Sequence, residues 1–501
     1  MNIGGPLNWQ ACARLLSPPC QDVSVPLRRL PQPRLLWLNE RAARDDANFH
    51  AMGADTAAYG RHLLTACGFV VSAPGGGSDA EGHADRYGGA GIGRNGGSGR
   101  NVFVNGYQIK GVGRTPLVSA LTAESHASGG AYLEECVREA IFSEVVAAEF
   151  PYGAVPTLAI IDTGRVQIWD TALGPKRERR TLLVRPAFLR PAHFERAVGF
   201  HSGRHLEGLR DHGRVVQTFG TAVEVLGRDT LREQFEALGS RWAHQLAYAF
   251  VHRLPHGSNT SSNIAFDGRL VDFGAMTALP SWSKTATALL PDPFESRFAS
   301  VEQAIRSLSY YFGRHLHPKL GEAHAIEVRV SRARADFERC VTYEVLRLCG
   351  VPDGLAADAV VSPRAAHLWR YVRRCIAHYQ TEQIDFVESV QLPGLPWDLH
   401  RVWEARTPAH LNLLHGVLMD LVAASARDEA RQTCLLRCSP RPQLYAPATK
   451  ENLYAALEAV PELGPREDAR RIAHLVEATV LASRRDRLGR DASRGPRLLL
   501  G

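Results

Sequence analysis

Two side chains with metal-ligand chemistry lie close together near the middle of the chain. Asn263 ends the run H-G-S-N-T-S-S-N that starts at His256, and Asp272 begins Asp-Phe-Gly. Magnesium takes hard oxygen ligands at about 2.1 Å and usually needs only one or two protein groups besides phosphate and water. A loop, a short strand over 269–271 and a turn can bring this amide and this carboxylate to one point. The spacing therefore predicts a magnesium site for nucleotide phosphates.

A glycine-rich segment over residues 73–100 precedes two expected strands, over 101–105 and 107–110. Glycines between strands allow backbone N–H groups to approach phosphate without obstruction by side chains. This favours a phosphate-binding loop over residues 88–100, whereas a flexible linker fits residues 73–84 better. The candidate nucleotide-binding residues of the loop are Gly89, Gly91, Gly93 and Arg100.

A lysine at the end of the second strand and a glutamate on the next helix form another candidate pair. Lys110 begins K-G-V-G-R-T-P, in which Gly111 and Gly113 are further candidates for contact with the nucleotide. Apolar residues at spacings of three and four predict a helix over 131–150, and Glu139 and Glu144 interrupt its apolar face. Protein kinases position a cation on the nucleotide phosphates with such a pair, and hold metal with an Asn and the Asp of Asp-Phe-Gly. Exposed Lys and Glu are otherwise usually only solvated.

Two arginines follow strands expected over 157–163 and 165–169 and a charged turn over 176–180. Arg185 and Arg190 lie in L-L-V-R-P-A-F-L-R-P. The planar guanidinium binds oxyanions through two hydrogen bonds, so either residue could clamp a phosphate. Two surface arginines at the corner between a strand and a loop explain the pattern equally well.

The composition sets limits on the remaining possibilities. The chain has 501 residues, of which 45% are hydrophobic and 22% charged, and such a length predicts two or three lobes at about 150 residues each. The net charge of +7 favours an anionic ligand, but no basic cluster with interleaved aromatic residues indicates nucleic acid. An odd number of scattered cysteines fits reduced thiols. Without a signal peptide or a long apolar run, we expect a cytoplasmic protein that contacts no membrane.

Seven motifs in order resemble those of the SelO family, kinase-fold proteins that transfer AMP to hydroxyl side chains of proteins. The resemblance extends from Pro33 to about Pro280. The motifs are P-R-L-L-W-L-N-E from Pro33, Y-G-G-A-G-I-G-R-N-G-G-S-G-R from Tyr87, K-G-V-G-R-T-P from Lys110, V-R-E-A-I-F-S-E from Val137, P-A-F-L-R-P-A-H-F-E from Pro186, R-W-A-H-Q-L-A-Y-A-F-V-H from Arg241, and H-G-S-N-T-S-S-N-I with V-D-F-G.

The resemblance implies roles for the matching positions. Lys110 and Glu139 would be the ion pair that positions the nucleotide, and the ligands of Mg²⁺ would be Asn263 and Asp272. Arg190 falls on the second of two family arginines that bind the phosphates of a nucleotide in flipped orientation. Arg185 lies closer to Arg190 in the sequence than the first family arginine lies to the second, so the position of the first stays open. The implied cofactors are ATP and Mg²⁺, and the implied partner is a protein or peptide acceptor.

The loop departs from the family at its proton acceptor. The family reads H-G-V-M-N-T-D-N, with an Asp before the metal-binding Asn, and this chain has Ser262 there. Small-molecule kinases of related fold place the base at the position of Ser258, which is also serine. The loss of a general base lowers a rate by about 10²- to 10⁴-fold. Two alternatives to AMP transfer therefore stay open. One is a peptide-maturation enzyme that activates a carboxylate as an acyl-adenylate or acyl-phosphate, and the other is a catalytically impaired pseudokinase scaffold.

The expected fold is α+β, two-lobed and like that of a protein kinase. Residues 1–34 are expected to be an irregular extension, 35–200 a β-rich N-lobe, 201–440 a helical C-lobe with the metal-binding loop, and 441–501 a helical extension with a basic tail. The main helices are expected over 56–67, 131–150, 230–254, 301–316, 328–349, 365–387, 408–424, 450–459 and 467–484.

Overall fold

The structure is a computed structural model, and it describes most of the chain. The described residues are 7–17, 20, 23–89, 96–118, 127–172, 174–197, 207–279, 281–282, 284–286, 298–380, 383–385, 397–445, 448–458 and 465–485.

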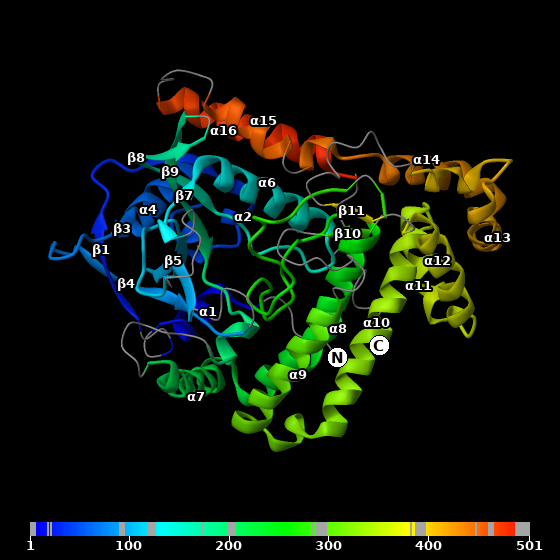
Figure 1. Ribbon diagram of the computed structural model, residues 1–501, viewed down its shortest axis with the longest axis horizontal. Coiled ribbons are helices and arrows are strands. Elements are labelled where there is room, and N and C mark those ends of the chain that lie inside the picture. Colours follow the sequence, from blue (N-terminus) through cyan, green and yellow to red (C-terminus); the bar gives the residue numbers. More distant parts are fainter. Residues whose placement is uncertain are drawn as a thin grey trace.

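An antiparallel sheet forms one side of the molecule (Figure 1). Its strands are β1 (Ser24–Arg29), β2 (Arg34–Leu38), β3 (Phe69–Val71), β4 (Ala80–Arg86), β5 (Gly97–Val104), β6 (Tyr107–Lys110), β7 (Ala131–Tyr132), β8 (Ala159–Thr171) and β9 (Gly174–Pro186). In the described chain the strand order is β2-β8-β9-β6-β5-β4-β1-β3, and β7 pairs with β9.

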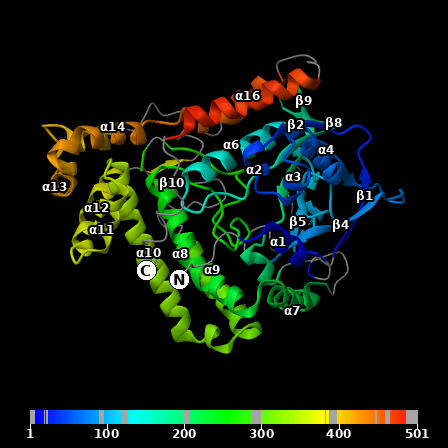
Figure 2. The same cartoon turned by 180° about the vertical axis from the view of Figure 1, so that it is seen from behind.

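Helices cover the sheet and fill the other side of the molecule, as the view from behind shows (Figure 2). Those on the sheet side are α1 (Trp9–Leu15), α2 (Glu40–Ala43), α3 (Ala47–Ala51), α4 (Thr56–Cys67) and α6 (Leu133–Glu149). α16 (Pro465–Ser483) also lies on this side, against β2 and α6, and α15 (Ala448–Glu458) packs on α6. The others are α7 (Glu207–Leu226), α8 (Arg228–Val251), α9 (Phe298–His315), α10 (Ala323–Leu348), α11 (Asp353–Val361), α12 (Ala365–Tyr379), α13 (Asn412–Leu421) and α14 (Arg427–Cys438).

The central strands of the sheet are buried on both faces, because their successive side chains enter two different hydrophobic cores. On β9, Leu182 and Val184 belong to the core beneath α4, whereas Leu183 between them belongs to the core around α6. Successive side chains of a strand point to opposite faces of its sheet. The sheet is therefore held between α4 on one face and α6 on the other, and this fixes the strand ends near α6 where the candidate site lies.

Several local expectations are wrong. The segment 1–34 is not irregular, because it contains α1, which Asn8 caps at its N-terminus, and the sheet strand β1. The stretch expected to be a linker over 73–84 contains the start of β4, which pairs with β1 and β5. The charged stretch 176–180 is no turn, since it lies within β9 and pairs with β8. Exposed charged side chains do not prevent backbone pairing in a solvated ribbon.

Two further elements end differently from the expectation. The helix expected over 365–387 ends at Tyr379, and Gln383–Asp385 forms strand β11, paired in parallel with β10 (Lys284–Ala286). The short strand expected over 269–271 is reduced to isolated bridges of Leu270 with Ala154 and Ile264. In both places the structure depends on backbone pairing with another segment of the chain. A local sequence pattern carries no information about that partner segment.

The mixture of helices with an antiparallel sheet confirms the expected α+β class. The two-lobed kinase arrangement and the four domain boundaries stay predictions, and residues 486–501 of the expected tail lie outside the described chain. In the described residues no single helix is long and apolar enough to cross a membrane, although one bent pair, Ala409–Leu421 with Ala424–Leu444, passes by length and composition.

Candidate functional site

Lys110 lies at the centre of a cluster of carboxylates. It ends β6, is only 2% exposed, and its Nζ lies 2.7 Å from Glu139 Oε1 on α6. The same Nζ lies 2.9 Å from Glu135 Oε1 and 3.3 Å from Asp272 Oδ1. The predicted pairing of the strand lysine with a helix glutamate is therefore present. One cation joins the sheet, helix α6 and the Asp-Phe-Gly segment.

Glu139 is the glutamate of α6 that reaches the site, and Glu144 is not. Both oxygens of Glu139 are engaged, because Oε2 accepts from Arg185 Nη2 at 2.6 Å and from the backbone N–H of Phe273 at 3.2 Å. Glu144 instead binds Asn39 and Arg41 at 2.6 and 2.8 Å. Residues five positions apart lie on different faces of a helix, so only one of the two can face Lys110.

The Asp-Phe-Gly segment is fastened so that its carboxylate faces the lysine. Asp272 has φ of +65°, a left-handed conformation that non-glycine residues rarely adopt. Arg138 of α6 holds the following turn, since its Nη1 donates to the carbonyl of Gly274 at 2.5 Å and its Nη2 to that of Met276. The Asp272 side chain stays 43% exposed. A carboxylate that is both oriented and accessible suits a ligand that arrives from solvent.

Asn263 lies beside this segment through the backbone. The N–H of Val271 donates to the carbonyl of Asn263 at 3.1 Å, so the residue before Asp272 pairs with Asn263 itself. The amide Nδ2 of Asn263 donates to Ser258, at 2.9 Å to its Oγ and 3.1 Å to its carbonyl. With the nitrogen so engaged, the amide oxygen accepts no hydrogen bond from a described residue.

The oxygens of Asp272 and Asn263 fit a magnesium ion chemically. One carboxylate and one amide oxygen are the hard ligands it prefers, with phosphate and water completing the shell. In the described chain no group of three or more His, Cys, Asp or Glu side chains could hold a metal.

The loop before Asn263 carries serine hydroxyls at the two positions, 258 and 262, where related proteins carry a general base. Ser262 Oγ lies 2.8 Å from Thr260 Oγ1, and its carbonyl accepts from Arg190 Nη1. The hydroxyl of Ser261 donates to Glu195, a buried carboxylate that also accepts from Ser307 at 2.5 Å. The carboxylate of Glu195 is thus hydrogen-bonded to Ser261, and among the described residues neither Ser262 nor Ser258 is hydrogen-bonded to a carboxylate.

Three glycines of the predicted nucleotide site have conformations that other residues adopt rarely. Gly89, Gly111 and Gly113 have φ of +82°, +96° and +119°. A Cβ on Gly89 would lie 2.6 Å from both Glu195 Oε2 and Ser261 Oγ, and one on Gly111 would lie 2.6 Å from Ala131 and Thr181. Close packing and backbone conformation account for Gly89 and Gly111, whereas at Gly113 the nearest atom, Val71 Cβ, lies 3.3 Å from such a Cβ and the backbone conformation is the main constraint. Gly91 and Gly93 lie outside the described residues, and phosphate binding by the loop stays a prediction.

The three candidate arginines have protein carboxylates or carbonyls as partners. Arg100 binds Glu135 at 2.7 Å, and Arg185 binds Glu139 and, at 3.3 Å, Gln108. Arg190 binds Asp85 at 3.2 Å and the carbonyl of Ser262, with its guanidinium between the rings of Tyr87 and Phe188. In the described chain they orient the site's carboxylates and loop, and phosphate binding by any of them stays a prediction.

The electrostatics keep Lys110, Asp272 and Glu135 charged. Although burial and a nearby guanidinium lower the pKa of Lys110, the surrounding carboxylates raise it above its usual value. Burial would raise the pKa of Asp272, but Lys110 holds it well below its usual range. Glu135 behaves likewise, since Arg100 and Lys110 overcome burial and lower its pKa. The ammonium of Lys110 and the carboxylates of Asp272 and Glu135 therefore stay ionised at neutral pH.

Sequence reasoning missed three residues of this cluster. Glu135 lies one helical turn before Glu139, so the helix spacing could have identified it as a second partner of Lys110. Asp85 is fully buried and binds Gln108 at 2.6 Å, Arg190 and His193, but it lies within the glycine-rich stretch and gave no signal. Arg138 looked like a polar interruption of the apolar face, because the position of the Asp-Phe-Gly turn was unknown.

Residues 89–305 match a family model described as protein adenylyltransferase SelO. The matched range contains Lys110, Glu139, Asn263 and Asp272, together with β5 to β9 and α6 to α8. No curated protein matches the chain.

Proposed function

We propose that this chain, whose residues 89–305 match the SelO protein adenylyltransferase model, transfers AMP from ATP to a protein or peptide acceptor. The contact that carries the proposal is that of Lys110, whose Nζ lies within 3.3 Å of both Glu139 and Asp272. A cation fixed on the sheet beside an accessible carboxylate supports the binding of a polyphosphate together with its metal. The same arrangement supports a two-lobed organisation, with residues 35–200 and 201–440 on either side of the nucleotide.

Each charged group has a distinct task in this proposal. Lys110 binds the phosphates, and Glu139 with Glu135 holds its ammonium in place. Asp272 and Asn263 hold the Mg²⁺, which neutralises phosphate charge that develops during transfer. Arg138 keeps the Asp272 turn against α6 through its hydrogen bond to the carbonyl of Gly274.

The acceptor chemistry is the open part of the proposal. A hydroxyl acceptor must lose a proton, but Ser262 and Ser258 occupy the positions where a base is expected. A carboxylate acceptor is already an anion and needs no base, so activation of a peptide carboxylate as an acyl-adenylate is the second candidate function. Serine at both candidate base positions, Ser258 and Ser262, favours this second function. A scaffold without chemistry has no need for a buried lysine held among three carboxylates, one of which is open to solvent.

Labelled ATP separates these functions. The protein is incubated with Mg²⁺ and either α-labelled or γ-labelled ATP, with and without total cytosolic protein. AMP transfer places the α label on protein and releases pyrophosphate. Carboxylate activation as an acyl-adenylate releases pyrophosphate only when a peptide partner is present, and hydroxylamine traps the activated acyl group. An absence of both nucleotide binding and turnover would refute the two enzymatic functions and leave the scaffold.

A further inference from the structure

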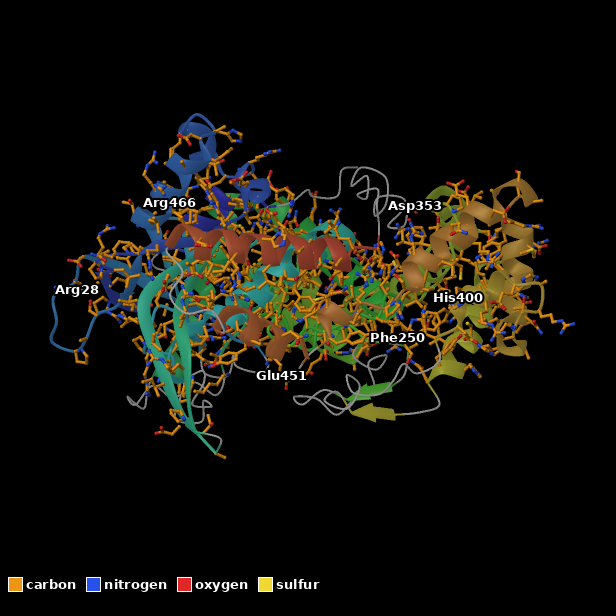
Figure 3. The ribbon with its side chains drawn as sticks, turned by 90° about the horizontal axis from the view of Figure 1, so that it is seen from above. Arg28, Phe250, Asp353, His400, Glu451 and Arg466 are labelled. Carbon is orange, nitrogen blue, oxygen red and sulfur yellow. The ribbon has the colours of Figure 1, made fainter. Side chains whose placement is uncertain are left out.

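The outer half of the β8–β9 ribbon extends away from the rest of the sheet (Figure 3). β2 pairs with β8 only as far as Asp162, and the pairing of β7 with β9 goes no further out than Arg180. From Arg165 to Thr171, the residues of β8 pair with β9 alone in the described chain. They therefore form an edge strand with one side open.

The sequence explains why no neighbour continues along this edge. β2 begins at Arg34, opposite Asp162, and Pro33 precedes it. Proline has no N–H for a ladder hydrogen bond, so the pairing ends there. On the other side of the ribbon, the hydroxyl of Tyr454 from α15 donates to the carbonyl of Arg177 at 3.1 Å. The edge of β9 is thus partly covered, and that of β8 is open.

Ile168 directs backbone groups out of this open edge. Its carbonyl accepts from the side chain of Gln167 at 3.1 Å. In an antiparallel ladder, hydrogen-bonded and non-hydrogen-bonded residue pairs alternate. Counted from the closing pair Thr171↔Gly174, which is hydrogen-bonded, the pair of Ile168 with Arg177 is non-hydrogen-bonded. The N–H and C=O of Ile168 therefore both face away from β9. A row of such groups is a template for another strand.

The face of the ribbon beside this edge is apolar and basic. Val166 and Ile168 are 45% and 54% exposed. Arg179 lies opposite Val166 and Arg177 opposite Ile168, so the four side chains share one face. Arg179 is engaged with Asp162 and Asp468, whereas Arg177 is exposed and has no ion pair with a described residue.

The charge of the ribbon is strongly positive. Residues 165–180 carry five Lys or Arg and two Asp or Glu side chains, which gives a net charge of +3. Lys176 and Arg179 have carboxylate partners, but Arg165, Arg177 and Arg180 form no ion pair with any described residue. Two ribbons from separate copies would repel each other, whereas a segment with acidic side chains would neutralise the unpaired arginines.

We propose that the open edge of β8 over residues 165–171 binds an extended, acidic segment of another polypeptide as an added strand. The backbone of the segment pairs with Ile168. Its apolar side chains cover Val166 and Ile168 on one face of the ribbon, and its acidic side chains, which alternate with them, reach the exposed Arg165 on the other face. Backbone pairing supplies affinity and the alternation of side chains supplies specificity, as in other cases of strand addition. This binding goes beyond the proposed function, since it requires neither ATP nor group transfer.

The test uses a fluorescein-labelled ten-residue peptide of alternating Glu and Val, and fluorescence anisotropy with the full chain in the absence of ATP. A peptide of five Glu followed by five Val has the same composition without the alternation. Three variants probe the edge: Ile168→Asp removes the apolar contact, Arg165→Glu reverses the charge on the face that the acidic side chains meet, and Ile168→Pro removes the outward N–H and keeps an apolar side chain, which an edge strand tolerates. Leu481→Asp, at a residue of α16 that is 77% exposed, is the matched control.

The alternating peptide should bind at least about tenfold more tightly than the block peptide, and each of the three variants should weaken it by at least about tenfold. Leu481→Asp should leave binding unchanged, and thermal unfolding of all variants should match the unmodified protein. Equal binding of the two peptides, or variants without effect, would overturn the proposal. Two other results would also overturn it if neither peptide binds. One is self-association of the protein that Ile168→Asp abolishes, and the other is binding of a labelled single-stranded DNA that the same variant abolishes.

Discussion

Lys110 and Asp272 are 162 positions apart in the sequence, and Nζ of the lysine lies 3.3 Å from Oδ1 of the aspartate. Glu139 joins them, because it binds the lysine and accepts from the N–H of Phe273, the residue after Asp272. The strand, the helix and the loop thus share one charged cluster. In the proposed function, a nucleotide bound at Lys110 would therefore also meet the candidate metal ligand Asp272.

Asp272→Asn should abolish the stabilisation of the protein by ATP with Mg²⁺. The change keeps the size of the side chain but removes the only anionic ligand proposed for the metal. A ligand at a hundred times its dissociation constant adds about 2.7 kcal/mol to the free energy of unfolding, and this increment should vanish. Asn263→Ala should reduce it less, because a neutral ligand is lost. Thermal unfolding with and without the nucleotide measures both effects.

The matched control is Asp229→Asn, which alters a carboxylate on α8 whose side chain is 81% exposed. It should leave the increment intact. Full stabilisation of Asp272→Asn by ATP with Mg²⁺ would show that the metal is held elsewhere.

Much of this cluster could be predicted from the sequence, because local patterns carry it. The end of a strand gives Lys110, helical spacing gives Glu139 and Glu144, and the loop motifs give Asn263 and Asp272. The helical pattern alone does not choose between the two glutamates, since that depends on which face of α6 meets the sheet; the family resemblance selects Glu139, which does contact Lys110. The partner of Arg185 depends on the register of β6 and β9, where Gln108 lies opposite Arg185. That register is a long-range property.

The fold was predictable to a similar extent. Helices such as 56–67 were expected within a residue or two of their ends, because their apolar spacing is regular and Asp55 caps α4. Strands with irregular or charged sequences were missed. β4 contains Glu81, His83 and Asp85, and the outer part of β9 is mostly charged. Their backbone pairing outweighs a weak local preference, and β-propensity depends strongly on such context.

Glu139→Gln should destabilise the protein more than Glu135→Gln. Glu139 is 1% exposed and binds two buried cations and a backbone N–H, whereas the Glu135 side chain is 21% exposed. Loss of one member of a buried ion pair costs about 3–5 kcal/mol, because the remaining charge stays buried without its partner. Glu135 also pairs with two cations, Arg100 and Lys110, but its partial exposure to solvent screens these pairs, so its loss should cost less. Unfolding in urea measures the difference, and equal losses would contradict the central place of Glu139.

Glu195→Gln should stabilise the protein at neutral pH and not at acid pH. Burial raises the pKa of Glu195 above its usual value, although the hydroxyls of Ser261 and Ser307 oppose the shift. A carboxyl whose folded pKa is raised contributes most below its unfolded pKa of about 4.3 and loses that contribution as pH rises through the folded value. Glutamine does not ionise and is spared this loss.

The measurement is the temperature of unfolding of both proteins from pH 4 to pH 8. The Gln variant should match the unmodified protein near pH 4 and unfold at a higher temperature near pH 8. Glu451→Gln, at an exposed position of α15, should show no such divergence. A constant difference across the range would mean that Glu195 is not the titrating group.

Ser262→Asp distinguishes the two enzymatic functions, because it places a carboxylate directly before Asn263. If the acceptor is a hydroxyl, the new carboxylate supplies the missing proton acceptor, and transfer of the α label from ATP to protein should rise by about tenfold or more. If the acceptor is a carboxylate, the new charge repels it. Repulsion at about 4 Å costs roughly 1 to 4 kcal/mol, depending on the effective dielectric, and turnover should fall.

Ser262→Asn is the matched control, since it has nearly the same size as aspartate without its charge or basicity. It should produce neither the gain nor the electrostatic loss. We expect the fall in turnover, because both candidate base positions carry serine while Lys110 and Asp272 remain in contact. A clear gain of AMP transfer to protein in Ser262→Asp, and not in Ser262→Asn, would refute an anionic acceptor and assign the site to hydroxyl side chains.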